Sequence, residues 1–458
     1  MPSLHKKVPT IAEIGHKVES SLTITYRDIQ ELRPNSQNPR VHSKKQIQQL
    51  ANSIKQLGFN VPILVNRKLQ IVAGHGRAEA AKTLGISRIP TIRLDHLDEA
   101  QFRAFTIADN RLTDQSTWDE HLLAEQFKVL SDLDLNFSLE VTGFEMGEID
   151  VMVEGFSTAS KEGEDAADEL PELTSGTRVA RRGDVWSLGR HRVACGDALD
   201  EEAYRLLMEN HRAAAIFTDP PYNDPIDGFV TRSGKIHHPK FAMAAGELSK
   251  AEFTEFLHKC FSLLLRNSEP GALHFICMDW RHSPELLTAA DKVFAEFKNL
   301  CVWVKDTGGQ GSLYRSQHEL VFVFKSTKKQ HRNNVQLGRY GRYRTNVWQY
   351  PRVNSFGKTN PEGEFTALHP TVKPVSLVAD AVLDSTARGD IVLDPFLGSG
   401  TTLIAAERVG RICYGIEMTP QYVDLAIRRW QSFTGQAAVH CQSRQSFRER
   451  EEVADEKR

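Results

Sequence analysis

A short segment with the sequence TDPPYN, residues 218–223, has the groups needed to hold an exocyclic amine of a nucleobase. The carboxylate of Asp219 and the main-chain carbonyl of Pro220 can accept hydrogen bonds from the amine. These bonds favour a more nucleophilic nitrogen, and the carboxylate can take the released proton. Pro221 stiffens the loop, and Tyr222 can stack on the base. A plain β-turn after a strand is the alternative interpretation.

A second segment, DPFLGSGTT at residues 394–402, has the glycines that bring backbone close to a cofactor. Asp394 ends an apolar run, and Gly398 and Gly400 form the turn before a helix. Glu417 follows about 20 positions later, which suits a ribose diol. The GK[ST] of a phosphate loop and the third glycine of the dinucleotide fingerprint are both absent. A nucleoside without phosphates, S-adenosylmethionine, therefore fits better than a nucleotide, and a turn without a ligand is the alternative.

These two segments, together with HPTVKP at residues 369–374, resemble motifs of amino-methyltransferases that act on DNA, specifically the permuted β group. In that group the catalytic motif precedes the cofactor motif, as it does here. The resemblance covers roughly residues 183–430. It implies methyl transfer from S-adenosylmethionine to an exocyclic amine of double-stranded DNA, with four catalytic residues: Asp219, Pro220, Pro221 and Tyr222.

The resemblance also implies which residues bind the cofactor. The expected set is Asp394, Phe396, Gly398, Gly400, Thr401, Thr402 and Glu417, with Lys373 and Pro374 beside the methionine end and Asp197 and Ala198 beside the adenine. Asp197 would accept a hydrogen bond from the adenine amine, although a turn aspartate has the same appearance.

Adenine N6 is the preferred target because Asp219 is the first residue of the catalytic motif, and enzymes of the resembling group that methylate cytosine N4 more often carry serine there. Cytosine N4 is the alternative. No Pro-Cys nucleophile motif is present, which disfavours methylation of a ring carbon. A ParB-like DNA-binding protein with an inactive methylase half is a second alternative, and an RNA or protein-glutamine substrate is a third. The intact motifs, their permuted order and a basic insert favour DNA.

The basic insert spans about residues 326–358 and contains eight Lys or Arg and no acidic residue. Its basic side chains can neutralise phosphates, and its aromatic side chains can stack on bases. The candidate DNA-binding residues are Arg339, Arg342, Arg344 and Tyr343. A solvated basic loop is the alternative. Residues 303–305 and 318–319 also resemble the group's sheet-end segment, but no individual role is assigned to them.

The N-terminal unit resembles the ParB/sulfiredoxin-like domain through residues 35–40, 74–77 and 108–111. In partition proteins a Gly-x-x-Arg segment at a helix start binds nucleotide phosphates. Gly74 and Arg77 occupy those positions and form a candidate site for CTP or another nucleotide. The GHGR sequence has fewer arginines than partition proteins do, and no helix-turn-helix is evident after the domain. A structural or DNA-docking role is the alternative.

The 458 residues are too many for one ordinary core, and 40% hydrophobic with 25% charged residues is typical of a globular protein. A net charge of −2 confines nucleic-acid contacts to local patches. Six scattered cysteines, no metal-ligand pattern, no signal peptide and no membrane-length apolar run predict a cytoplasmic protein. The resemblance to DNA amino-methyltransferases implies a bacterial or phage origin and an association with restriction–modification. A homodimer is one option for its assembly.

The predicted organisation has four parts: a ParB-like domain at 20–150, an acidic linker at 151–176, a methyltransferase domain at 177–435 and a charged tail at 436–458. The N-terminal domain is expected to be α+β. The larger domain alternates apolar strands with helices, which predicts an α/β, Rossmann-like fold with a mostly parallel sheet covered on both faces. Its candidate strands are residues 214–218, 273–278, 300–304, 320–324, 391–393 and 413–416, and its candidate helices are residues 250–265, 283–297, 375–385, 401–409 and 420–431.

Overall fold

The computed structural model describes residues 22–133, 135–157, 166–168, 178–223, 246–308, 313–351 and 372–455. The chain divides into two compact units, residues 1–156 and 157–458. The division falls within the acidic stretch that the sequence predicts to be a linker. Most of that stretch, and the end of the basic insert through the HPT of HPTVKP, lie outside the described residues.

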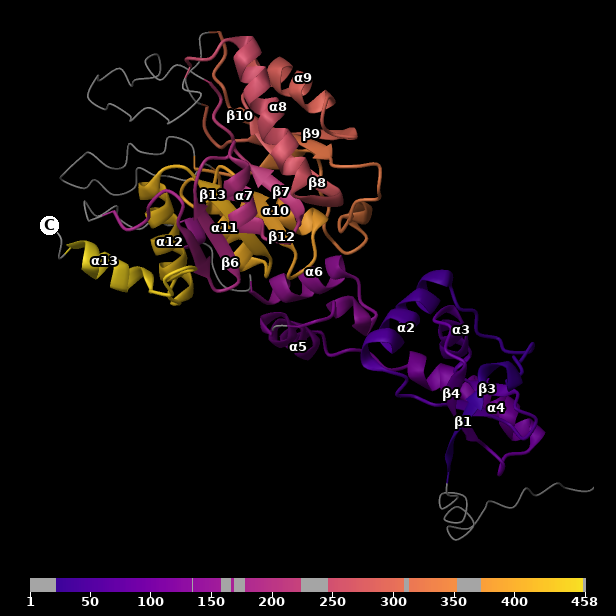
Figure 1. Ribbon diagram of the computed structural model, residues 1–458. Helices are drawn as coiled ribbons and strands as arrows, with labels where there is room; N and C mark the ends of the chain where they lie inside the picture. Colours follow the sequence, from indigo (N-terminus) through magenta and orange to yellow (C-terminus); the bar gives the residue numbers. More distant parts are fainter. Residues whose placement is uncertain are drawn as a thin grey trace, which may run out of the picture. The chain divides into compact units, whose positions relative to one another are not determined.

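The N-terminal unit contains a small sheet with the spatial order β1-β4-β2-β3 (Figure 1). Its strands are β1 (Ile24–Asp28), β2 (Ile63–Val65), β3 (Ile71–Ala73) and β4 (Arg88–Arg93), and its first α-helices are α2 (Lys44–Leu57), α3 (His75–Thr83) and α4 (Glu99–Asp114). Strands β2 and β4 pair in parallel, whereas β1 with β4 and β2 with β3 pair antiparallel. This is the α+β domain that the sequence predicts, with β1 and α4 in addition.

Residues at the ends of α2 and α3 explain where these helices begin and end. Ser43 Oγ accepts a hydrogen bond from the backbone N–H of Gln46, and Gly58 ends α2 with a φ of 90°. Gly74 precedes α3 with a φ of 99°, a conformation that a residue with a Cβ rarely adopts. The backbone N–H groups at the start of α3 receive no side-chain cap from Gly74.

Three short helical segments follow the small sheet: α5 (Glu120–Asp132), η2 (Leu139–Thr142) and α6 (Met146–Ser157). The η2 segment packs against α2, where Gln49 donates a hydrogen bond to the carbonyl of Gly143, the residue after η2, at 2.8 Å. The ring of Phe144 packs edge-on against Trp118 and Phe127, with centroid distances of 5.7 and 5.3 Å. The sequence does not predict these helices.

The C-terminal unit contains a large twisted sheet with the order β11-β9-β10-β8-β7-β12-β13-β6-β5-β14. The strands are β5 (Val185–Leu188), β6 (His191–Cys195), β7 (Ala213–Thr218), β8 (Ser268–Met278), β9 (Glu296–Val304), β10 (His318–Lys325), β11 (Val347–Gln349), β12 (Ile391–Asp394), β13 (Ile412–Glu417) and β14 (Val439–His440). The run β8-β7-β12-β13-β6 is parallel, and antiparallel pairs flank it on both sides. The predicted α/β fold is confirmed, with a sheet that is parallel at its centre.

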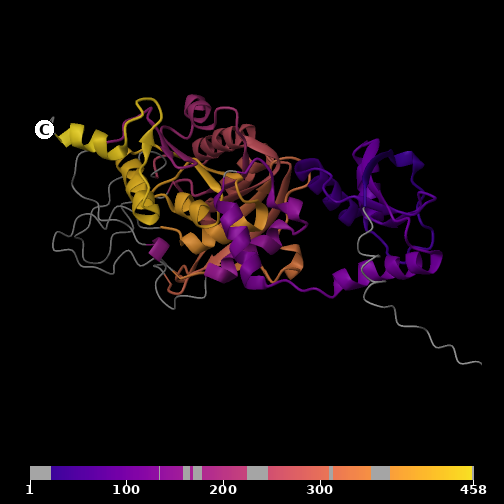
Figure 2. The same cartoon turned by 90° about the horizontal axis from the view of Figure 1, so that it is seen from below.

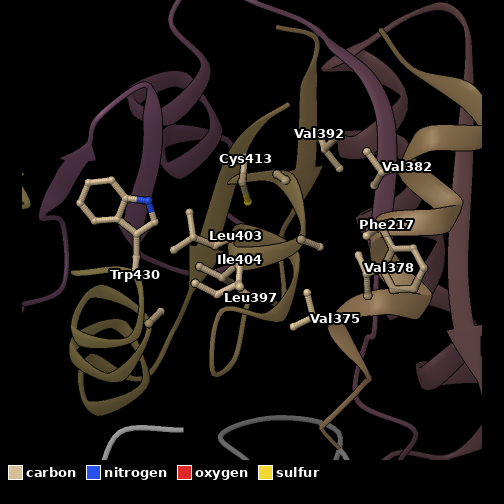
Figure 3. Close-up of a cluster of buried hydrophobic side chains, with 14 of the residues drawn as sticks. Phe217, Val375, Val378, Val382, Val392, Leu397, Leu403, Ile404, Cys413 and Trp430 are labelled. Carbon is tan, nitrogen blue, oxygen red and sulfur yellow. The ribbon is translucent and has the colours of Figure 1, made fainter. Parts of the chain in front are cut away.

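Helices cover both faces of this sheet, as predicted (Figure 1). They are α7 (Glu201–Met208), α8 (Lys250–Arg266), α9 (Ser283–Asp291), α10 (Val375–Ser385), α11 (Thr401–Arg408), α12 (Pro420–Thr434) and α13 (Phe447–Asp455). Ile216 and Phe217 of β7 point to opposite faces, since side chains alternate along a strand. Phe217 joins Val378, Leu403 and Trp430 in the core against α10, α11 and α12 (Figure 3), and Ile216 joins the core against α7, α8 and α9.

Two local predictions differ from the structure. The helix predicted over residues 283–297 ends at Asp291, and β9 begins at Glu296. The apolar residues of a helix and a following strand form one continuous pattern here, so periodicity alone places the boundary too late. The charged C-terminal stretch contains β14, which pairs with β5, and α13, the yellow helix beside the C-terminus in Figures 1 and 2. Phe447 is only 1% exposed and holds α13 on the core.

Within the described part of the chain, no helix is both long and apolar enough to cross a membrane.

Candidate active site

Four acidic residues follow four adjacent strands of the sheet at the same edge. Asp219 comes directly after β7, Asp394 ends β12, Glu417 ends β13, and Asp197 lies just beyond β6. Because β7, β12, β13 and β6 run parallel, their carboxyl ends meet at one edge, where the ligands of such sheets bind. The fold therefore places segments that are far apart in the sequence along one acidic rim.

Asp394 ties the cofactor motif to the catalytic motif. Its Oδ1 accepts hydrogen bonds from the Thr218 hydroxyl at 3.0 Å and from the Phe396 backbone N–H at 3.1 Å. Its Oδ2 accepts from the Thr402 hydroxyl at 2.7 Å. The side chain is almost completely buried, and this burial raises the pKa of Asp394 to about 7 against the opposing effect of the three hydrogen bonds.

The glycine turn between β12 and α11 is closed by Glu417. Gly398 and Gly400 have φ values of 53° and 85°, and Gly400 is the residue at which α11 begins. A Cβ at Gly400 would lie 3.0 Å from the Cβ of Ala426, so glycine is also needed for packing against α12. Glu417 accepts backbone hydrogen bonds from Gly398 at 2.9 Å and from Thr419 at 2.7 Å. Burial raises the pKa of Glu417, although these bonds oppose the shift.

The carboxylate of Asp219 has a partner on each oxygen. The Tyr222 hydroxyl donates to Asp219 Oδ1 at 2.6 Å, and the Lys373 ammonium donates to Oδ2 at 2.5 Å. Burial raises the pKa of Tyr222 well above its ordinary value, so the phenol stays protonated and acts as a donor. Asn223, with a φ of 55°, accepts from the backbone N–H groups of Gly246 and Leu248 and holds the chain beyond the motif.

A pocket joins the predicted catalytic and cofactor residues. Its lining residues include Phe217, Asp219, Lys373, Asp394, Phe396, Gly398, Ser399, Thr401 and Thr402. Pro374 stands at the start of α10, next to this lining. Asp197 and Ala198 lie at the same sheet edge beyond β6, where Asp197 accepts from the backbone N–H of Leu199 at 2.8 Å and Ala198 accepts from the Tyr204 hydroxyl at 3.0 Å.

The chemistry of this edge fits a cationic nucleoside better than a phosphate ester. Three acidic side chains, those of Asp197, Asp394 and Glu417, lie at this sheet edge, and acidic groups do not favour a phosphate. Carboxylates are also suitable acceptors for a ribose diol and for an adenine amine, and their negative charge suits a sulfonium. The residues present therefore fit S-adenosylmethionine.

Comparison with known sequences places the C-terminal unit. The family model described as DNA methylase matches residues 213–428, which contain the catalytic segment and the glycine turn. A type II methyltransferase from Moraxella bovis, M2.MboI, is 34% identical over 230 residues, which cover 48% of this chain and 81% of that protein. The chain belongs to the N6/N4 DNA methylase family.

Further comparisons concern the N-terminal unit, a solved structure and the cofactor. The family model of the ParB N-terminal domain matches residues 15–111. A ParB-like nuclease domain-containing protein from Escherichia coli K12, YnaK, is 44% identical over 84 residues, or 18% of this chain and 97% of that protein. Among solved structures, the M1.HpyAVI–SAM complex has a TM-score of 0.38 and 22% identity, and the match covers 52% of this chain and 97% of that one. Methylases of this family depend on S-adenosylmethionine, which is accordingly the cofactor of this chain.

A third family model, the ParB-methyltransferase HTH domain, matches residues 121–182. This match includes α5 and α6, and it corrects the expectation that no helix-turn-helix is evident after the ParB-like domain. It also overlaps the stretch that the sequence predicts to be a linker. The signal is weak in the sequence because α5 buries few side chains, with Ala124 and Phe127 the fully buried ones among its described residues, so its apolar periodicity is faint.

The methylase does not present two of its four candidate DNA-binding residues to solvent. Arg342 pairs with Asp384 at 2.8 Å and Asp380 at 3.3 Å. Arg344 pairs with the same two carboxylates at 3.0 and 3.1 Å and donates to the Tyr350 hydroxyl at 2.8 Å. Both guanidinium groups are largely buried and anchor the insert to α10.

The other two candidates, Arg339 and Tyr343, lie in the same segment, and Tyr343 is 82% exposed. Asn334, just before them, caps the end of α10 by donating to the carbonyls of Leu383 and Thr386. That end lies about 15 Å along the helix from Pro374, given a rise of 1.5 Å per residue. The structure thus holds this part of the insert away from the catalytic end of α10.

The sequence does not predict a role for several residues that contribute to the site. Thr218 and Asn223 flank the catalytic residues inside the same motif, and their hydrogen-bonding side chains are the signal that could have identified them. Glu319 and Lys305 lie near the ends of β10 and β9 and contact the site through Lys373. Their spacing along the chain carries no such signal, because the contact depends on strand pairing.

Proposed function

We propose that this methylase transfers a methyl group to the exocyclic N6 amine of adenine in double-stranded DNA. The observation that carries the proposal is a pocket that joins Asp219 to the glycine turn. A carboxylate that accepts hydrogen bonds from an amine therefore lies beside the loop that suits the methyl donor. Cytosine N4 is the alternative target, since its amine presents the same donors to the same acceptors.

Each catalytic group has a defined task in this mechanism. The target base must leave the helix, and the half-buried ring of Tyr222 can stack on it. Asp219 and the Pro220 carbonyl accept hydrogen bonds from the two amine protons, which increases electron density on the nitrogen. S-adenosylmethionine supplies an electrophilic methyl group on its sulfonium. Methyl transfer would leave positive charge on the nitrogen, and Asp219 would accept the proton that the nitrogen then releases.

The preference for adenine rests on the residue type at the head of the motif. Asp219 is a carboxylate, which can accept from both the amine and its own neighbours and can also take up a proton. The serine more often found in cytosine-N4 enzymes can accept a hydrogen bond but is a much weaker base. The preference therefore rests on the residue type at position 219, and the proposed roles of the catalytic groups are the same for either amine.

Expression in a bacterium without endogenous DNA methylation tests the proposal directly. Long-read sequencing is expected to show N6-methyladenine at one recurring sequence context and none in cells that express Asp219→Ala. Detection of modified cytosine would show that the target base is cytosine and would leave the assignment as a DNA methyltransferase unchanged. Unmodified DNA from cells that contain soluble protein with bound S-adenosylmethionine would refute DNA methylation.

For the N-terminal unit we propose nucleotide binding at the start of α3. Gly74 has no side chain that could cap the first N–H groups of α3, and such groups bind phosphate. Arg77 lies beside Gly74, and its Nε is buried without a hydrogen-bond partner among the described residues. A DNA-docking or purely structural role remains the alternative for this domain.

Binding of labelled CTP to the full chain tests this second proposal. Arg77→Ala is expected to weaken binding by about tenfold or more, because a charged hydrogen bond to phosphate is lost. Lys82→Ala is the matched control, since Lys82 lies in the same helix and its ammonium pairs with Glu79 on the surface. Absence of CTP binding by the unaltered chain would favour the docking or structural role.

A further inference from the structure

Lys373 lies between two carboxylates at the centre of the site. Its Nζ is 2.5 Å from Asp219 Oδ2 and 3.0 Å from Glu319 Oε2. Glu319 in turn pairs through Oε1 with Lys305 Nζ at 2.5 Å. Four side chains thus form a line of alternating charge, Lys305–Glu319–Lys373–Asp219, that ends at the catalytic carboxylate.

This line is buried, so its charges are poorly screened by solvent. Lys373 is 5% exposed and Glu319 is 9% exposed. Burial disfavours both ions, but Asp219 and Glu319 outweigh it and raise the pKa of Lys373 above its ordinary value. In the same way Lys373 and Lys305 overcome the burial of Glu319 and lower its pKa. Lys373 and Glu319 therefore each favour the charged form of the other.

Aromatic rings confine the two ammonium groups to this line. Lys373 Nζ is 5.8 Å from the centre of the Tyr222 ring and 5.9 Å from that of Trp303, and Lys305 Nζ is 4.8 Å from Trp303. These distances allow cation–π attraction. The indole N–H of Trp303 donates to the carbonyl of Tyr350 at 2.9 Å, which fixes the ring.

We infer that Glu319 is a positioning residue that competes with Asp219 for the ammonium group of Lys373. This competition sets the pH range in which the enzyme works. The inference rests on the proposed function, in which Asp219 acts as hydrogen-bond and proton acceptor. A full ion pair with Lys373 would keep Asp219 ionised but would make it a weaker proton acceptor. Glu319 also pairs with the Lys373 ammonium and so weakens the pair between Lys373 and Asp219. Lys305 pairs with Glu319 and limits this weakening.

The other ionisable groups that face this line come from the strands packed around it. Asp394 from β12, whose pKa burial raises to about 7, adds only part of a negative charge at neutral pH. Tyr222 and Cys277 remain neutral because burial raises the pKa of each well above its ordinary value. Asp219 would thus lie in a negative environment without Lys373, which favours its protonation. The line supplies the positive charge that opposes this.

The test is the rate of methyl transfer into DNA as a function of pH, measured for the full chain and four variants. Lys373→Met should lower the rate about 100-fold at neutral pH and move the loss of activity on the acid side to higher pH. Lys305→Met should also move the acid-side loss of activity to higher pH, by less than Lys373→Met does, because Glu319 then pairs more strongly with Lys373 and weakens its pair with Asp219. Glu319→Gln should move it to lower pH, because Lys373 then pairs fully with Asp219. Lys373→Arg should restore most of the rate.

The matched control is Glu296→Gln, which breaks a pair with Lys325 at the other end of the same two strands. It should leave both the rate and the pH profile unchanged. Equal pH profiles in all variants, with only the rate reduced, would overturn the inference and leave a structural role. The proposed function is tested separately, because its failure would abolish DNA methylation by the unaltered chain.

Discussion

Replacement of Asp219 by alanine is expected to lower the rate of methyl transfer by about 1,000-fold or more, while the affinity for S-adenosylmethionine changes only a few-fold. The variant removes the carboxylate that accepts the amine proton. The cofactor turn does not depend on this side chain, because Asp394 and Glu417 hold it through the backbone N–H groups of Phe396 and Gly398. The measurements are the rate of label transfer from the cofactor to DNA and the cofactor dissociation constant by calorimetry.

The Asp219→Asn variant sharpens this prediction. An amide oxygen still accepts a hydrogen bond but does not take up the proton, so a smaller loss, about 100-fold, is expected. The amide also loses the ion pair with Lys373, which then depends on Glu319 alone. Loss of cofactor binding together with transfer in the alanine variant would mean that Asp219 serves the cofactor and is misassigned as the acceptor.

Replacement of Asp394 by alanine is expected to destabilise the C-terminal unit by about 2–4 kcal/mol and to abolish cofactor binding. The variant leaves the Phe396 N–H without its acceptor and removes the partner of two buried hydroxyls, those of Thr218 and Thr402. Denaturant unfolding followed by tryptophan fluorescence measures the stability. A variant as stable as the unaltered chain would show that the turn holds itself without this carboxylate.

The pH dependence of stability distinguishes the charge of Asp394 from its hydrogen bonds. Its pKa of about 7 lies above the ordinary value of 3.8, so the folded chain keeps a proton that the unfolded chain releases. The resulting contribution is complete at acid pH and is lost as the pH rises toward 7. Asp394→Asn removes this dependence. Its stability relative to the unaltered chain should therefore rise by on the order of 2 kcal/mol between pH 5 and 7, and a constant difference would refute the shift.

The prediction of the family and its cofactor rests mainly on the residues within each motif and on the order of the motifs. A carboxylate followed by two prolines and a tyrosine, and later a glycine turn after an apolar strand, are local patterns whose physical requirements can be read directly. Alternation of strands and helices likewise predicts a sheet covered on both faces, since each element must bury its apolar side. The helix predicted over residues 375–385 is α10, and the predicted glycine turn directly precedes α11.

The basic insert shows where composition is insufficient. Eight basic residues and no acidic ones predict a surface for DNA, but Arg342 and Arg344 are neutralised by Asp380 and Asp384. These acids lie on α10, well outside the insert, so no window of sequence contains both partners. Charge balance within a local stretch therefore misjudges an insert that crosses the edge of the sheet and packs on another element.

The sequence by itself determined the family of this methylase, its cofactor and the order of its two motifs along the chain. Only the tertiary structure decided which side chains share one environment. The parallel strands β7, β12, β13 and β6 bring the acids to one edge, and the return of β10 beside β9 brings Glu319 and Lys305 to Lys373. The reason is physical, because strand pairing creates contacts between residues whose separation along the chain carries no signal of their proximity.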